Sequence, residues 1–182
     1  GRVGEVTTQE KELLRADADL SEIIREVSDK ARGLFVETFA KVQGHFEEIF
    51  RRLFAGGEGK LVLLEPDHPL ESGIEIVVRP PGKKSQLVTL LSGGERAMTS
   101  IALTMALFRI KPSPFCVLDE LDAPLDDRNV ARYLDIVREF MDRTQFVIIT
   151  HNKITMELGE LLYGVTMEEK GVSKLVAVRL GA

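Results

Sequence analysis

The sequence contains a single cysteine, Cys116, among 182 residues. One thiol cannot form a disulfide framework, and Cys116 lies inside the apolar run 115–118, so we interpret it as a small core residue rather than a reactive thiol. The chain also lacks an apolar run of about 18 to 20 residues, the length that a membrane helix needs. It does not open with a basic segment followed by an apolar one. These absences predict a cytoplasmic protein with no membrane partner.

Basic residues are not in excess, because 24 Lys and Arg stand against 29 Asp and Glu and give a formal net charge of −5. A domain that binds nucleic acid over a broad surface usually carries a stripe or an excess of Lys and Arg. Any DNA contact should therefore be local. Arg51–Arg52 and Lys83–Lys84 are the candidates, although we favour ordinary solvated surface charge as the interpretation of both pairs.

Proline is absent from residues 7–54, and glycine occurs there only twice. Apolar residues recur with spacings of four and three at Leu20, Ile24, Val27, Ala31 and Leu34. This heptad spacing predicts a coiled-coil helix. A second stripe, Phe35, Phe39, Val42, Phe46, Ile49 and Leu53, widens the apolar face, so the helix should end in a protein core. A long amphipathic helix of a bundle is the alternative, and residues 1–6 show no periodicity and are expected to be a linker or a cloning remnant.

Beyond residue 55 the sequence alternates between short β-type runs and helical segments. We expect strands at 60–65, 73–79, 115–118 and 145–150, helices at 95–108, 128–141 and 153–162, and two final strands at 163–166 and 171–180. Strands that alternate with helices predict an α/β fold with a mostly parallel sheet covered by helices on both faces. The remaining strands should form β-hairpin elements beside it.

Polar residues gather in a glycine-rich turn just before the helix expected at 95–108. Ser92 and Glu95 have the spacing of a helix capping box, which is a common structural feature. Gly93 and Gly94 leave backbone amides open at the positive end of a helix, where a phosphate can bind. The residues alone leave both interpretations open.

Two further polar groups follow apolar strands. Asp119 and Glu120 end the strand at 115–118, and His151 follows the strand at 145–150. Ligands of α/β sheets bind at the carboxyl ends of the strands, so Asp119 could hold Mg²⁺ while Glu120 activates a water. A solvated acidic turn that includes Asp122 explains the carboxylates equally well, and a lone histidine at a strand end is more often structural.

The order of these features is more specific than any one of them. The turn is followed about 24 residues later by the Asp-Glu strand end, and the histidine comes about 30 residues after that. This order resembles the second half of an ATP-binding cassette (ABC) ATPase head, over about residues 35–180. The resemblance implies a signature motif at Ser92, Gly93, Gly94 and Glu95, a Walker B pair at Asp119 and Glu120, a D-loop at Ala123–Asp126 and a switch histidine at His151. It makes Glu120 and His151 catalytic, assigns Mg²⁺ to Asp119, and gives ATP contacts to the signature residues and Asp126.

Within this superfamily, residues 114–127 and Thr150–Lys153 resemble the head of a structural maintenance of chromosomes (SMC) protein. Transporters usually continue Asp-Glu with Pro-Thr, whereas Glu120 is followed here by Leu-Asp-Ala-Pro-Leu-Asp. Residues 162–167 and 171–173 strengthen the resemblance. Pro124 stands where the family commonly has a small residue such as alanine, a departure that bears on the flexibility of the D-loop.

An ATP site of this family also needs the P-loop sequence Gly-x-x-x-x-Gly-Lys-Ser/Thr, which this sequence does not contain. Residues 57–60 do not qualify, because their glycines are too close together and Lys60 is followed by leucine and opens a strand. In SMC proteins the P-loop lies in an N-terminal lobe, beyond a long coiled coil and a hinge. The resemblance therefore implies that residues 7–54 are the neck of the returning arm and that residues 55–182 are the C-terminal head lobe.

This resemblance implies an ATPase that is active only when the N-terminal lobe completes it. A second head would join in an ATP-dependent dimer, a kleisin subunit would bind through its C-terminal winged-helix domain, and DNA would be held by the full complex. The setting implied is chromosome condensation and segregation at the nucleoid. Two alternatives remain: a lobe that acts mainly as a kleisin platform through residues 171–180, and the head lobe of a related coiled-coil DNA-repair ATPase.

Overall fold

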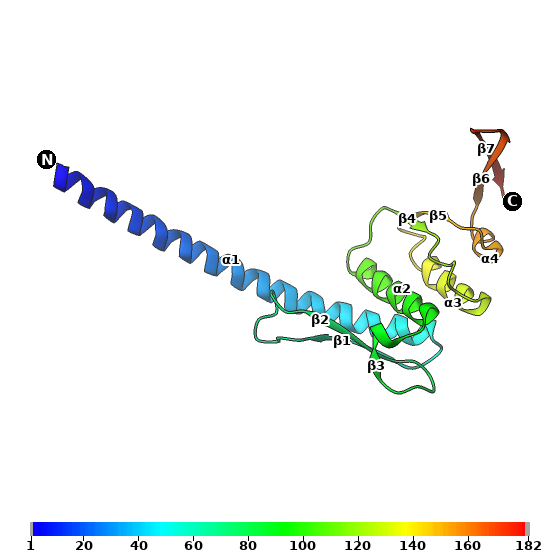
Figure 1. The fold of residues 1–182 in the computed structure, drawn as a ribbon, viewed down its shortest axis with the longest axis horizontal. Helices are drawn as coiled ribbons and strands as arrows, with labels where there is room; N and C mark the ends of the chain where they lie inside the picture. Colours follow the sequence, from blue (N-terminus) through cyan, green and yellow to red (C-terminus); the bar gives the residue numbers. More distant parts are fainter. Residues whose placement is uncertain (1, 181–182) are drawn as a thin grey trace. The chain divides into compact units, whose positions relative to one another are not determined.

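The computed structural model describes residues 2–180 (Figure 1). The elements in chain order are α1 (Arg2–Leu53), β1 (Glu58–Leu63), β2 (Ile74–Arg79), β3 (Gln86–Leu87), the 3₁₀ turn η1 (Val88–Leu90), α2 (Gly93–Ile110), β4 (Phe115–Asp119), α3 (Asp127–Arg138), β5 (Gln145–Ile149), α4 (Lys153–Met156), β6 (Leu161–Glu169) and β7 (Val172–Arg179). Strands and helices alternate from β3 to β6, which confirms the α/β class.

The chain divides into two compact units. One holds the chain up to Lys41 together with Leu63–Ile74, and the other holds Val42–Val62 and the chain from Glu75 onward.

In the first unit, the helix is longer than the sequence predicts. It begins at Arg2, so residues 2–6 continue the helix, and residue 1 lies outside the described residues. The assignment of residues 1–6 to a linker or cloning remnant stays a prediction. The heptad residues Leu20, Ile24, Val27 and Leu34 are all more than half exposed. Apolar side chains at this spacing need a partner helix to bury them, so the coiled coil remains a prediction.

In the second unit, the end of α1 enters a core, as predicted. Val42, Phe46, Ile49 and Leu53 are buried, and Phe50 stacks on Phe54 with ring centroids 4.1 Å apart. Helices α2 and α3 supply much of the rest of this core, with Ile101, Ala102, Met105, Ala106, Val130, Tyr133, Leu134 and Val137 all buried.

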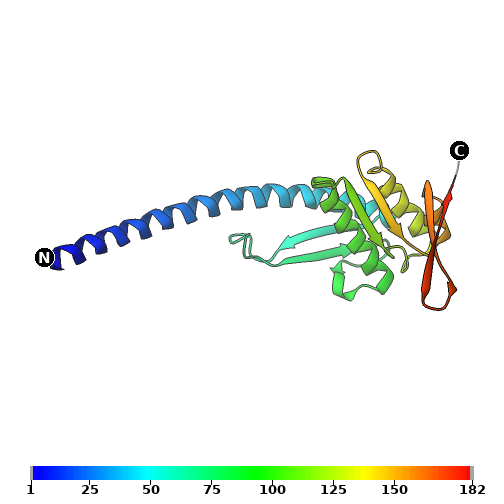
Figure 2. The same ribbon diagram turned by 90° about the horizontal axis from the view of Figure 1, so that it is seen from above.

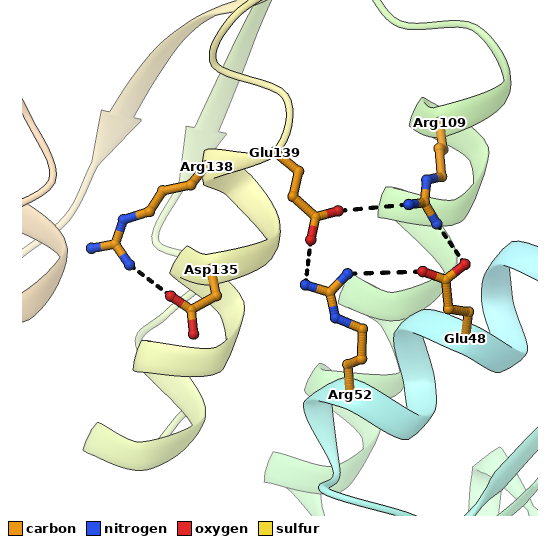
Figure 3. Close-up of polar contacts among 6 residues, drawn as sticks. All are labelled: Glu48, Arg52, Arg109, Asp135, Arg138 and Glu139. Carbon is orange, nitrogen blue, oxygen red and sulfur yellow. Dashed lines mark hydrogen bonds and ion pairs between the residues drawn. The ribbon is translucent and has the colours of Figure 1, made fainter.

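Four charged side chains tie these three helices together at the surface (Figure 3). Glu48 and Arg52 lie on α1, Arg109 on α2, and Glu139 at the end of α3. Arg109 pairs with Glu48 at 2.7 Å and with Glu139 at 3.6 Å, and Arg52 pairs with the same two carboxylates. Arg109 thus joins α2 to both α1 and α3, and Arg52 joins α1 to α3. Arg52, a candidate DNA contact in the sequence, is therefore engaged in an internal network.

Strands β4 and β5 are parallel, with Phe115 opposite Gln145 and Asp119 opposite Ile149. Helices α2 and α3 lie on one side of this pair in both views (Figures 1 and 2). Phe146 of β5 lies 6.1 Å from Phe108 of α2, measured between ring centroids. The residues that face the other way, Phe115, Val117, Val147 and Ile149, are each at least half exposed. Helices thus cover one face, whereas the sequence predicted cover on both.

The C-terminal part departs from prediction in one element. The helix expected at 153–162 ends at Met156, and the chain enters β6 at Leu161. The apolar spacing of residues 154–162 is typical of a helix. However, Leu161 is paired with Arg179 in the antiparallel hairpin β6–β7, and this pairing determines the local structure.

Candidate functional site

The turn at residues 91–95 forms the start of α2. Ser92 is the N-cap, and it forms a capping box with Glu95. The Ser92 hydroxyl donates to Glu95 Oε2 at 2.7 Å, and the Ser92 backbone N–H donates to the same oxygen at 3.2 Å. A Cβ placed on Gly93 would meet no atom within 4 Å, so this side of the turn is open. The capping-box interpretation is confirmed, and an open amide-rich end remains available beside it.

The Glu95 carboxylate has a second partner. Lys83 Nζ lies 2.8 Å from Glu95 Oε1. The bond to Lys83, followed by those to Ser92, holds the pKa of Glu95 below its usual value. Lys83 was a candidate DNA contact in the sequence, and the structure pairs it instead with the turn at residues 91–95. We call this turn the signature turn, after the motif that its sequence resembles.

Asp119 and Glu120 lie at the carboxyl end of β4 with exposed side chains. Glu120 has φ +48°, a left-handed conformation that is uncommon for a residue other than glycine. Its backbone N–H donates to the carbonyl of Ile149 at 2.9 Å, which fixes this turn to the end of β5. A strained backbone persists only where the surrounding structure holds it in place, and such residues cluster at functional sites.

His151 lies beside Glu120. Its Nδ1 is 3.9 Å from Glu120 Oε1, and both side chains are mostly exposed. Parallel pairing of β4 with β5 produces this proximity, because it places the carboxyl ends of the two strands at one edge. Residues that are 31 positions apart are thus brought together, so they can act on one bound group.

Asp122 is the residue that sequence reasoning missed. The sequence groups Asp122 with a solvated acidic turn, but Asp122 is only 2% exposed. Its Oδ2 accepts hydrogen bonds from Thr150 Oγ1 at 2.6 Å and from Thr155 Oγ1 at 2.5 Å. Thr150 immediately precedes His151, so Asp122 locks the turn after β4 to the turn after β5. Its threonine partners lie 28 and 33 positions away in the sequence. The only local signal for the burial of Asp122 is that its neighbours Leu121 and Ala123 are apolar.

Asp126 is the N-cap of α3 and accepts from the Asn129 backbone N–H at 2.9 Å and from Asn129 Nδ2 at 3.0 Å. Its carboxylate therefore has a structural partner in this chain. The preceding loop passes close to the signature turn, since a Cβ placed on Gly94 would lie 3.4 Å from the carbonyl oxygen of Pro124. The hydrogen bonds and ion pairs within residues 2–180 include none that joins the signature turn to Glu120 or His151.

Two negative findings apply to the described part of the chain. Among residues 2–180, every helix is either too short or too polar to span a bilayer. Nor do three or more His, Cys, Asp or Glu side chains within residues 2–180 gather into a group that could hold a metal ion unaided.

Comparisons with known proteins identify the family of this chain. The profile of the RecF/RecN/SMC N-terminal domain matches residues 8–174, and the chain belongs to this family. Among curated relatives, it is 51% identical over 175 residues to the chromosome partition protein Smc of Myxococcus xanthus and 46% identical over 175 residues to that of Bacillus subtilis. Each alignment covers 96% of this chain and 15% of the relative, so the chain spans about a seventh of their length.

Solved SMC heads share the fold. An Smc head of Pyrococcus furiosus with an extended coiled coil, bound to the C-terminal domain of ScpA, matches with a TM-score of 0.82 and 35% identity, over 96% of this chain and 44% of that one. An Smc head bound to the C-terminal winged-helix domain of ScpA matches with a TM-score of 0.76 and 39% identity, over 81% of this chain and 46% of that one. A chain from work on ATP-driven dimerisation of SMC ATPases matches with a TM-score of 0.74 and 37% identity, over 81% of this chain and 89% of that one.

Proposed function

We propose that this chain is the C-terminal half of an SMC ATPase head and supplies the signature turn, the Walker B carboxylates and the switch histidine of an ATP-hydrolysing site. The observation that carries the proposal is the approach of Glu120 to His151 at the ends of paired parallel strands, next to Asp119. A base, a hydrogen-bond donor and a metal-binding carboxylate on one sheet edge are groups that catalyse phosphoryl transfer to water once the phosphates are bound.

Magnesium fits this edge of the sheet. Mg²⁺ is usually bound through one or two carboxylates, with substrate phosphates and waters completing the shell, and Asp119 is an exposed carboxylate of this kind. Asp119 would hold the ion, which when bound neutralises charge that develops on the phosphates. Glu120 accepts a proton from the attacking water, and His151 donates a hydrogen bond toward the transferred phosphoryl group.

Completion by an N-terminal lobe that carries the P-loop is supported by the bare face of β4 and β5. A row of apolar side chains exposed over two paired strands is the kind of surface that another part of a protein covers. The match to less than half of two solved heads also supports a lobe that pairs with another of similar size. The isolated chain should then bind ATP very weakly, because it lacks the phosphate-binding loop and its lysine.

The signature turn acts in the opposite head of an ATP-dependent dimer. Two observations favour action of this turn on a second nucleotide. The turn is open at Gly93, and among the described residues it makes no direct contact with Glu120. Asp119 and Glu120 would thus serve one ATP, and Ser92, Gly93 and Gly94 another, with Asp126 beside the dimer contact. Two heads joined around two ATP molecules would move the arms that hold DNA.

A second function, kleisin binding, is favoured by the hairpin β6–β7. Along one of its faces Leu161, Tyr163, Val165 and Leu175 are all at least 46% exposed, although the hairpin is well paired. Such a surface suits an apolar partner domain, and two solved relatives are bound to a ScpA domain. We propose that the hairpin holds the C-terminal winged-helix domain of a kleisin subunit, whatever nucleotide is bound.

The test uses a head reconstituted by coexpressing this chain with the matching N-terminal lobe. ATP should bind to the reconstituted head and not appreciably to this chain alone. Ser92→Arg should leave ATP binding intact but prevent ATP-dependent dimerisation, because the bulky cation would occupy the position of the partner's γ-phosphate. Micromolar ATP affinity of the chain alone would overturn the completion proposal, and ATP-dependent dimers of Ser92→Arg would overturn the role in the opposite head.

A further inference from the structure

The segment between β2 and β3 presents a lysine to the signature turn. Gly82 has φ +74°, and the backbone N–H of Lys83 donates to the carbonyl of Pro80 at 3.1 Å, so the chain turns sharply here. This turn aims Lys83 at α2, where its Nζ lies 2.8 Å from Glu95 Oε1.

The two oxygens of the Glu95 carboxylate have different partners. Oε1 is bound by Lys83, whereas Oε2 accepts the hydroxyl and the backbone N–H of Ser92. The three residues therefore form a chain in which Lys83 fixes Glu95 and Glu95 fixes Ser92. The Glu95 side chain is only 16% exposed, so its charge is partly shielded from water, and Lys83 lies at its open side with 52% exposure.

A carboxylate at this place conflicts with anion binding. The first turn of a helix attracts a phosphate through its free amides, and a negative charge within the same turn both occupies that positive end and repels the phosphate. The repulsion between two charges in a partly shielded site is several times stronger than in bulk water. The fold uses Glu95 for the capping box and needs a cation to cancel its charge.

We propose that Lys83 is a positioning residue of the signature turn, which neutralises Glu95 and orients Ser92 for the γ-phosphate of the ATP held by the opposite head. The inference rests on the proposed role of the signature turn and adds to it a residue outside the motif. It also gives a role to a lysine that the sequence left among candidate DNA contacts.

The test is a double-mutant cycle in the reconstituted head, with Glu120→Gln present throughout so that ATP is retained. Lys83→Met should weaken ATP-dependent dimerisation about tenfold, the loss expected for one charge-assisted hydrogen bond. Lys83→Arg should restore the dimerisation constant to within about twofold, because a cation returns. Lys84→Met is the matched control and should change it by less than about twofold, since Lys84 forms no ion pair among the described residues.

Glu95→Gln separates charge from structure, because glutamine also completes a capping box. In the Glu95→Gln background, Lys83→Met should no longer weaken dimerisation, since no carboxylate is left to neutralise. The effect of Lys83→Met on the Glu95 protein should shrink as salt rises. Equal losses from Lys83→Met in both backgrounds, or equal losses from Lys83→Met and Lys84→Met, would overturn the inference.

Failure of this inference can be told from failure of the proposed function. If Ser92→Arg prevents dimerisation while Lys83→Met does not weaken it, the signature turn acts across the dimer and Lys83 plays no part. If Ser92→Arg dimerises normally, the role of the turn is itself wrong. Nucleotide affinity of the monomeric head should be the same for Lys83→Met and Lys84→Met. The thermal unfolding temperature of Lys83→Met should lie no more than about 4 °C below that of Lys84→Met, the loss expected for one half-exposed ion pair. A larger selective loss in Lys83→Met would show a folding role and count against positioning.

Discussion

Replacing Glu120 by glutamine should stop hydrolysis without preventing ATP binding. The glutamine side chain keeps the shape and one hydrogen-bonding oxygen but loses the basic carboxylate, and a positioned general base contributes roughly 10² to 10⁴ in rate. Turnover of the reconstituted head should therefore fall by that factor, equivalent to about 3 to 5 kcal/mol in the activation free energy.

The structure indicates that folding will not account for this loss. The Glu120 side chain is 62% exposed, and the contact that fixes its unusual backbone is its N–H to the carbonyl of Ile149, which the substitution keeps. The unfolding free energy of the Glu120→Gln variant should differ from that of the wild type by less than about 0.5 kcal/mol, as for other surface substitutions. The ATP-bound mutant should accumulate as a head dimer, whereas the wild type passes through this state during turnover.

Asp119→Asn provides the contrast. It removes a proposed Mg²⁺ ligand, so affinity for Mg-ATP should fall together with turnover. The assay compares the two variants for Mg-ATP affinity, dimer mass in the presence of ATP, and hydrolysis rate. If Glu120→Gln hydrolyses ATP at nearly the wild-type rate, or binds ATP without forming dimers, the Walker B assignment is wrong.

Three further predictions concern the internal structure. Asp122→Ala should lower the unfolding free energy by about 2 to 4 kcal/mol in urea titrations, because the buried Thr155 hydroxyl and the half-buried Thr150 hydroxyl lose their acceptor. Exposed Asp127→Ala should cost less than about 1 kcal/mol, and equal losses would contradict the role of Asp122. Gly59→Ala should destabilise the chain by about 1 to 3 kcal/mol, since a Cβ would lie 2.9 Å from the Phe46 ring. Gly44→Ala has open space on a helix and should instead stabilise the chain by about 0.5 to 1 kcal/mol. Thermal unfolding measures both changes. Lys83 and Ser92 lower the pKa of Glu95, so the capping box should contribute its full stability above the ordinary pKa of 4.5 and lose that stability as pH falls through the lowered pKa. Carboxyl NMR titration should show the Glu95 pKa rising in Lys83→Met, and no rise would contradict the pairing.

Local patterns predicted most elements from the sequence. The end of α1 was assigned to the core from the stripe that includes Phe46, Ile49 and Leu53, and all three are buried. The capping box of Ser92 and Glu95 was recognised because both partners lie within one helical turn. Signals of this kind depend on residues close together in the chain, and they survive folding with little change.

Elements decided by distant pairing were predicted less well. Residues 154–162 carry a helical spacing, yet strand pairing with β7 places Leu161 and Leu162 in β6. Asp122 looked like any other acid of a turn, because burial by Thr150 and Thr155 depends on how β4 and β5 are brought together. Lys83 was equally ambiguous, since its partner Glu95 belongs to the next helix. The family resemblance predicts roles for Asp119, Glu120 and His151, and these roles stay predictions. The contacts that support these residues could not be predicted, because they depend on the fold.

The contacts of Asp122 have a consequence for how an ATP site would be assembled. Asp122 and the Glu120 N–H together join the turn after β4 to the end of β5, so the approach of Glu120 to His151 is built from contacts within this chain alone. The bare face of β4 and β5 is not needed to hold these groups in place. An N-terminal lobe that covers this face would then add the phosphate-binding loop to a hydrolytic edge that is already formed, so lobe pairing should raise ATP affinity while leaving the geometry of Glu120 and His151 unchanged. Chemical shifts of His151 that move greatly when the N-terminal lobe is added without nucleotide would show instead that this edge is formed only on pairing.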